Sequence, residues 1–286
     1  MKRVLLILCV FSLVLLCGCA ELTIIWPTWA EKPTTQATEP TQIPTEPTQT
    51  PTESEDPIIP TAPTDPTEGT EATQPPVKKK LIVIDAGHQG KSNKDKEPVG
   101  PGSTELKTKV SSGTSGCVSG YDEHEINLIV ALQLEKELLK RGYEVLMIRT
   151  TEDVDISNVQ RAQIANDAQA DAVIRIHCNS SDNETAHGAL TICQTANNPY
   201  QPQLYKVNRK LAQCVIDAFV EETDCYDRDV WETDTMTGLN WCEVPNCFIE
   251  LGFMSNPQED MLLADGDYQV LMVQGIANGI DNFFTE

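Results

Sequence analysis

Short apolar runs alternate with amphipathic stretches over the last 209 residues of the chain. The apolar runs predict buried strands at residues 80–85, 143–148, 172–177, 188–193 and 247–250. Apolar residues at helical spacing predict helices at residues 126–139, 158–168, 200–222, 257–264 and 267–283, with Gly142 ending the first. Residues 89–121 are polar and contain several glycines, which indicates a long loop. Because strands joined by helices need crossover connections, we predict a single α/β domain with a largely parallel twisted sheet flanked by helices.

The first nineteen residues have the pattern of an export signal. Lys2 and Arg3 precede an apolar run, residues 4–16, that is too short to span a bilayer as a helix. The run ends in Leu16-Cys17-Gly18-Cys19, which resembles a bacterial lipoprotein box. That resemblance implies a signal peptide at residues 1–18 and a lipid anchor on Cys19. The alternative is an ordinary secretory signal cleaved nearby, and both place the mature protein outside the cytoplasm.

Residues 19–77 are predicted to consist of the lipidated Cys19 followed by a disordered tether. The stretch repeats Thr-Glu-Pro-Thr-Gln and holds twelve of the eighteen prolines, with few large apolar residues. It therefore buries too little surface to offset the entropy of ordering, and proline favours an extended chain. Fully extended, it reaches on the order of 180 Å. That length lets a membrane-anchored domain work inside a cell wall.

Net charge narrows the range of partners. The chain carries a formal charge of -22, and residues 78–286 hold 33 acidic against 18 basic side chains. This balance excludes nucleic acid as a partner and argues against a polybasic membrane patch, because both need a basic face. A neutral, cationic or metal-containing target fits better.

Two histidines and a glutamate follow or end predicted strands. His88 comes just after the first strand, His177 ends the third, and Glu250 ends the last. Because sites in parallel sheets form outside the carboxyl ends of the strands, these side chains should meet at one edge. A further carboxylate, Glu123 or Glu125, opens the first helix.

This set of side chains suits a catalytic zinc ion, which takes three protein ligands and keeps one position open. His88, Glu123 and His177 fit the ligand roles, while Glu250 fits a group that carries the proton of an attacking water. Glu125 remains an alternative ligand because it lies in the same helical turn as Glu123. Asp122 and Glu125 also form a capping-box pattern. We interpret His124 as a solvated helix residue and His187 as structural.

Seven cysteines fall within residues 78–286, an odd number that cannot pair fully within one chain. No C-x-x-C pair is present, which argues against a zinc knuckle. Cys178 alternates with His177 along a strand and is predicted to be buried core, although a cysteine nucleophile at this position stays open. Cys214 lies on the apolar face of its helix and is also predicted to be buried.

Five motifs occur in a recognisable order: Ile84-Asp85-Ala86-Gly87-His88, Glu123-His124-Glu125-Ile126-Asn127-Leu128, Asn158-x-x-Arg161-Ala162-x-x-Ala165-Asn166, Arg175-Ile176-His177-Cys178-Asn179 and Ile249-Glu250-Leu251-Gly252-Phe253-Met254-Ser255-Asn256. Together they resemble the zinc-dependent N-acetylmuramoyl-L-alanine amidases of the Amidase_3 type, from about residue 81 to residue 284. These enzymes cleave peptidoglycan between N-acetylmuramic acid and the L-alanine of the stem peptide.

The resemblance implies a role for each matching residue. His88, Glu123 and His177 match the zinc ligands, with Glu123 rather than Glu125 in the ligand position. Glu250 matches the catalytic glutamate, and Asp85 is expected to orient a ligand histidine from behind. The expected protein is thus a lipid-anchored, monomeric, autolysin-type hydrolase whose catalytic domain spans residues 78–286.

The chain departs from the family pattern after the first histidine. Gln89 stands where the family often has glycine, and 34 residues separate His88 from Glu123. We expect this excursion to shape the substrate groove or to act as a lid. Two rival functions are a zinc peptidase that cuts elsewhere in the stem peptide and a non-catalytic wall-binding lipoprotein. A missing ligand or base would indicate the second, and all four positions are filled.

Overall fold

The structure is a computed structural model that describes residues 79–285. The predicted signal peptide at 1–18, the lipidated Cys19 and the tether at 19–77 lie outside the described residues. Among the described helices, none combines the length and apolar character needed to cross a bilayer.

Within residues 79–285, six strands form one sheet in the order β4-β1-β5-β8-β6-β7. The strands β4, β1, β5 and β8 run parallel, β6 is antiparallel to β8, and β7 is parallel to β6. The prediction of an α/β domain with a largely parallel sheet is therefore confirmed. The strand bounds are β1 Leu81–Ala86, β4 Glu144–Met147, β5 Ala172–Asn179, β6 Ala189–Cys193, β7 Asp227–Glu232 and β8 Asn246–Phe253.

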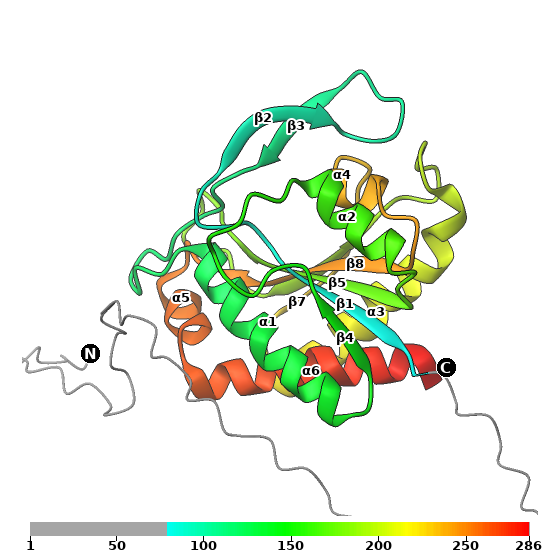
Figure 1. Cartoon of the computed structure of the whole chain (residues 1–286). Helices are drawn as coiled ribbons and strands as arrows, with labels where there is room; N and C mark the ends of the chain where they lie inside the picture. The colour runs from blue at the N-terminus through cyan, green and yellow to red at the C-terminus, as the bar shows by residue number, and fades with distance from the viewer. Residues whose placement is uncertain (1–78, 286) are drawn as a thin grey trace, which may run out of the picture. The chain divides into compact units, whose positions relative to one another are not determined.

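Helices cover both faces of this sheet (Figure 1). The helices α1, α3 and α6 pack on one face, in the main core that includes Ile82 and Ile84 of β1. On the other face, α2 packs in a smaller cluster with Val83 of the same strand, as the alternation of side chains along a strand requires. The helix bounds are α1 Glu123–Lys140, α2 Asn158–Asp167, α3 Tyr205–Thr223, α4 Thr237–Asn240, α5 Pro257–Leu263 and α6 Gly266–Thr285, with a 3-10 turn η1 at Pro202–Leu204.

Four elements were not predicted from the sequence. The predicted loop at 89–121 contains an antiparallel hairpin, β2 (Asn93–Pro98) and β3 (Leu106–Val110), which stands above the sheet on the side of α2 and α4 (Figure 1). Strand β7 and the short helix α4 were also missed. Strand β2 is entirely polar apart from Pro98, and β3 has only Leu106 and Val110 as apolar residues, so the hydrophobic signal of a strand is weak in this hairpin.

Candidate metal centre and active site

Three predicted ligands come together at the carboxyl ends of β1 and β5. Glu123 Oε1 lies 3.1 Å from His88 Nε2 and 3.0 Å from His177 Nδ1, and the two histidine nitrogens are 3.2 Å apart. His88 follows β1, His177 lies in β5, and Glu123 is the first residue of α1. The structure therefore unites residues 89 positions apart in the chain, as the rule for parallel sheets predicts.

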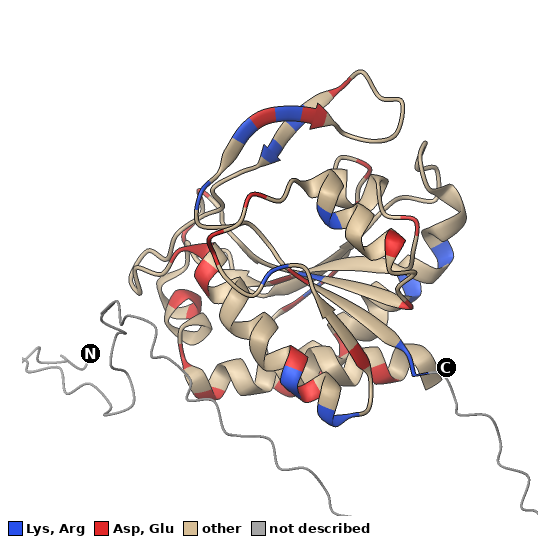
Figure 2. Cartoon of the chain, viewed as in Figure 1, with Lys and Arg blue, Asp and Glu red and all other residues tan. Residues whose placement is uncertain are grey.

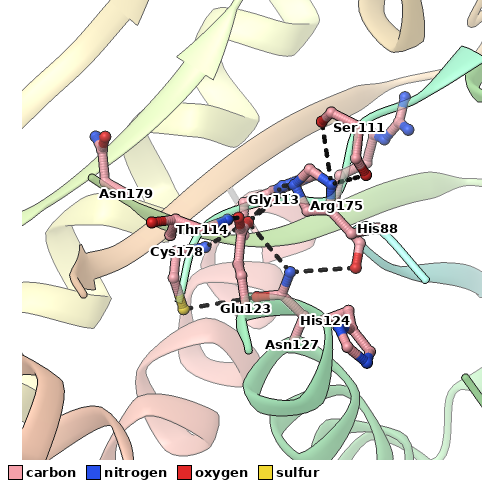
Figure 3. A network of polar contacts seen from close by, with 12 residues as sticks. His88, Ser111, Gly113, Thr114, Glu123, His124, Asn127, Arg175, Cys178 and Asn179 are labelled. Carbon is pink, nitrogen blue, oxygen red and sulfur yellow. Dashed lines mark hydrogen bonds and ion pairs between the residues drawn. The ribbon is translucent and has the colours of Figure 1, made fainter. Parts of the chain in front are cut away.

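His88 is oriented by the end of the hairpin. Its Nδ1 lies 3.0 Å from the carbonyl oxygen of Ser111, the residue after β3 (Figure 3). A carbonyl only accepts, so Nδ1 carries a proton and donates it, and Nε2 is the ring nitrogen left to bind a metal ion. The backbone of His88 is left-handed, with φ of 59°, and Arg161 binds its carbonyl oxygen at 2.8 Å.

The Glu123 carboxylate is buried and held by several donors. The backbone N–H of Thr114 donates to Oε2 at 3.0 Å, and the backbone N–H of Cys178 donates to Oε1 at 3.1 Å (Figure 3). Burial alone raises the pKa of a carboxyl, but hydrogen bonds and charge from His177 and His88 outweigh it and hold the pKa of Glu123 well below its usual range. The group is therefore an anion at neutral pH, as a metal ligand must be.

These three atoms fit a zinc ion. Ligands about 2.0–2.1 Å from a tetrahedral zinc lie roughly 3.3–3.4 Å from one another. The separations of 3.0–3.2 Å are close to that value, and the two nitrogens and one oxygen suit the preferences of zinc. Within the described residues, His88, Glu123 and His177 form the one such group of potential ligands.

Glu250 shares a cleft with the two histidines. The cleft has a volume of about 240 Å³ and is lined by His88, Val110, Ser111, Asn158, His177, Met236, Thr237, Gly238, Phe248 and Glu250. Glu250 pairs with His177 across β8 and β5, so their side chains rise from the same face of the sheet. Its side chain is half-buried, and burial together with the charge of Glu123 raises the pKa of Glu250 well above its ordinary value.

Comparison with known proteins identifies the family of the domain. The Amidase_3 family model, described as N-acetylmuramoyl-L-alanine amidase, matches residues 82–282. The chain belongs to this family. All four predicted site residues fall inside the matched segment.

Relatives and solved structures are similar to the chain over the same region. The germination-specific N-acetylmuramoyl-L-alanine amidase of Bacillus subtilis (strain 168) is 26% identical over 226 residues, covering 74% of this chain and 82% of that protein. The uncharacterized protein YqiI of the same strain is 28% identical over 211 residues, covering 74% and 88%. The crystal structure of an N-acetylmuramoyl-L-alanine amidase from Clostridium difficile 630 superposes with a TM-score of 0.60 at 26% identity, covering 73% and 98%.

In this Amidase_3 domain, Asp85 is connected to His88 through an arginine and not by a direct hydrogen bond. Its carboxylate binds Arg161 at 2.7 Å and Arg175 at 2.8 Å, and within residues 79–285 it makes no hydrogen bond to a ligand histidine. Burial alone raises the pKa of a carboxyl, but the two guanidinium groups lower the pKa of Asp85 to about 2. Asp85 therefore acts indirectly, by fixing the arginine that binds the carbonyl oxygen of His88.

The other candidate side chains lie outside the metal cluster. Glu125 accepts the backbone N–H of Asp122 at 2.9 Å, so it serves the predicted capping box. His124 is buried, contrary to our expectation, and its Nε2 lies 3.1 Å from the Glu152 carboxylate. Its ring points away from the Glu123 carboxylate (Figure 3). His187 is exposed, and its ring lies 5.1 Å from that of Tyr226 with the two planes tilted by 58°.

The two cysteines that were predicted to be buried are buried in the structure. Cys178 and Cys214 are 4% and 8% exposed. Burial and the neighbouring carboxylate of Glu123 raise the pKa of the Cys178 thiol well above its ordinary value, which argues against a nucleophilic thiolate there. Within residues 79–285, no disulfide joins the seven cysteines.

Gly87 is a positioning residue that sequence reasoning did not single out. A Cβ atom at this position would overlap the His177 ring. We expect Gly87→Ala to displace that ring and to lower zinc affinity by at least tenfold, with activity falling in parallel. Zinc content after dialysis against a competing chelator measures the effect.

Gly252→Ala is the matched control, because a Cβ there makes only ordinary contacts, the nearest at 3.5 Å. Equal zinc retention by Gly87→Ala and Gly252→Ala would show that the close approach of residue 87 to the ring is not required.

Proposed function

We propose that the chain is a zinc-dependent amidase that hydrolyses the bond between N-acetylmuramic acid and the L-alanine of peptidoglycan. The observation that carries the proposal is the cluster of His88, Glu123 and His177, with mutual distances of 3.0–3.2 Å, in a cleft that also holds Glu250. Membership of the Amidase_3 family supports this bond as the target.

The residues of the site have separate roles in the proposed reaction. His88, Glu123 and His177 would hold the ion, which supplies a Lewis acid that polarises the scissile carbonyl and makes nearby water more acidic. Glu250 takes a proton from the attacking water and then delivers it to the nitrogen of the departing L-alanine. The raised pKa of Glu250 suits both transfers, since a carboxyl that accepts a proton more readily also holds it for the leaving group.

Product analysis with and without a chelator tests the function. Digestion of muropeptides should release peptides with a free L-alanine amino group, and removal of zinc should abolish the release. Mass spectrometry of the products measures both. A cut inside the stem peptide would identify a zinc peptidase instead, and intact substrate with the zinc-loaded protein would identify a wall-binding lipoprotein.

We further propose that the domain, residues 78–286, works as a monomer outside the cytoplasm, tethered to the membrane through Cys19. The Leu-Cys-Gly-Cys sequence at the end of the apolar run supports this anchor. Cys19→Ser should move the protein from the membrane fraction to the soluble fraction, as measured by immunoblotting after fractionation. Cys17→Ser serves as the matched control and should leave it membrane-bound.

A further inference from the structure

One face of the β2–β3 hairpin binds to the body of the domain. Glu97 and Lys107 lie directly opposite each other in the strand register, so their side chains share this face. Glu97 accepts the backbone N–H of Val159 in α2 at 3.2 Å, and Lys107 donates to the carbonyl oxygen of Thr235 at 2.5 Å. These contacts fix the hairpin over the sheet.

The opposite face of the hairpin continues the wall of the cleft. Val110 of β3 lines the cleft, and the alternation of side chains puts Thr108 and Leu106 on the same face. Lys96 of β2 lies directly opposite Thr108 and donates to its hydroxyl at 2.9 Å. We call these four residues, Lys96, Leu106, Thr108 and Val110, the outer face of the hairpin.

The outer face combines a free positive charge with apolar surface. Within residues 79–285, no carboxylate forms an ion pair with Lys96, whereas Lys109 on the opposite face lies 3.4 Å from Asp95. Leu106 is 55% exposed. Figure 2 shows basic and acidic residues alternating along the hairpin, while the residues that line the cleft include no lysine or arginine. An anionic group on a substrate that extends out of the cleft along this face would therefore meet the Lys96 ammonium group.

We propose that the outer face binds the stem peptide and that Lys96 pairs with a free carboxylate on it. This inference rests on the proposed function, in which the scissile amide joins the sugar to the peptide and the peptide must leave the cleft on one side. From Leu106 to Val110, β3 spans on the order of 13 Å, which is about the length of an extended tetrapeptide. The exposed Leu106 suits an alanine methyl group, and the Lys96 ammonium suits a carboxylate.

Two synthetic muramoyl dipeptides test the proposal. Both contain L-alanine followed by D-glutamate whose side-chain carboxyl is blocked as a methylamide, one with a free α-carboxylate and the other with an α-amide. We expect kcat/KM to be roughly two- to fivefold higher for the carboxylate, the range for an exposed ion pair. The preference should shrink as salt concentration rises, should vanish in Lys96→Met, and should persist in Lys96→Arg.

Lys109→Met is the matched control, since it removes one positive charge from the opposite face of the same hairpin. It should keep the substrate preference, and zinc content should be equal in all variants. An unchanged preference in Lys96→Met, or an equal loss in Lys109→Met, would overturn the proposal. Calorimetry of both compounds with Glu250→Gln measures the same preference as a difference in binding affinity, without turnover. If the enzyme does not cleave the muramoyl amide, the proposed function is refuted. The contribution of Lys96 to binding is still measured by the calorimetry.

Discussion

Purified Glu123→Ala should contain almost no zinc and should hydrolyse no muropeptide. In the proposed zinc site Glu123 supplies one of three ligand atoms, and its carboxylate is held by Thr114, Cys178 and the two histidines. Loss of residues that merely orient ligands costs about 10–100-fold in metal affinity, so loss of a ligand should cost at least that much. Metal analysis of the purified protein and a competition titration with a chelator measure the effect.

Glu125→Ala provides the control from the same helical turn. Its carboxylate caps α1, so we expect a loss of helix stability of about 1 kcal/mol with zinc and activity retained. Full zinc occupancy in Glu123→Ala would show that the ion uses a different ligand. Loss of zinc from Glu125→Ala alone would exchange the roles assigned to the two glutamates.

The positions of the catalytic side chains could be predicted because topology dictates them. His88 follows β1, and His177 and Glu250 lie in the second halves of β5 and β8, so the parallel sheet gathers them at one edge whatever their separation in sequence. The choice between Glu123 and Glu125 could not be made from spacing alone, since both lie in one helical turn. The structure distinguishes the two glutamates, because the Glu125 carboxylate accepts a hydrogen bond from the backbone N–H of Asp122.

The supporting contacts could not be predicted, because much of the support comes from backbone atoms. The carbonyl of Ser111 orients His88 and the N–H of Thr114 holds Glu123, and any residue type offers those groups. The arginines that bind Asp85 could not be predicted for a related reason. Sequence gave no sign that Arg161 and Arg175, 76 and 90 positions away, would converge on its carboxylate.

The 89–121 segment shows the limits of hydrophobic periodicity. It was predicted to be a loop that shapes the groove or acts as a lid. In the structure it contains a hairpin whose end lines the cleft and orients a metal ligand. Contacts from Trp241 to Pro98 and from Asn240 to Val99 fix its far end, so the hairpin is bound at both ends. This favours a fixed wall over a lid.

Glu250→Gln should bind zinc normally and yet lose most of its activity. Glutamine keeps the size of the side chain but cannot take a proton from water or return it to the leaving nitrogen. A positioned acid–base group contributes about 10²–10⁴-fold, so kcat should fall by at least that range. Because Glu250 lines the cleft without belonging to the cluster of ligand atoms, metal content should stay equal to that of the unmodified enzyme. Single-turnover rates on a soluble muropeptide, with zinc measured in the same samples, separate the two effects. Retention of kcat within a few-fold would show that proton transfer uses a different group, and loss of zinc would make Glu250 a ligand.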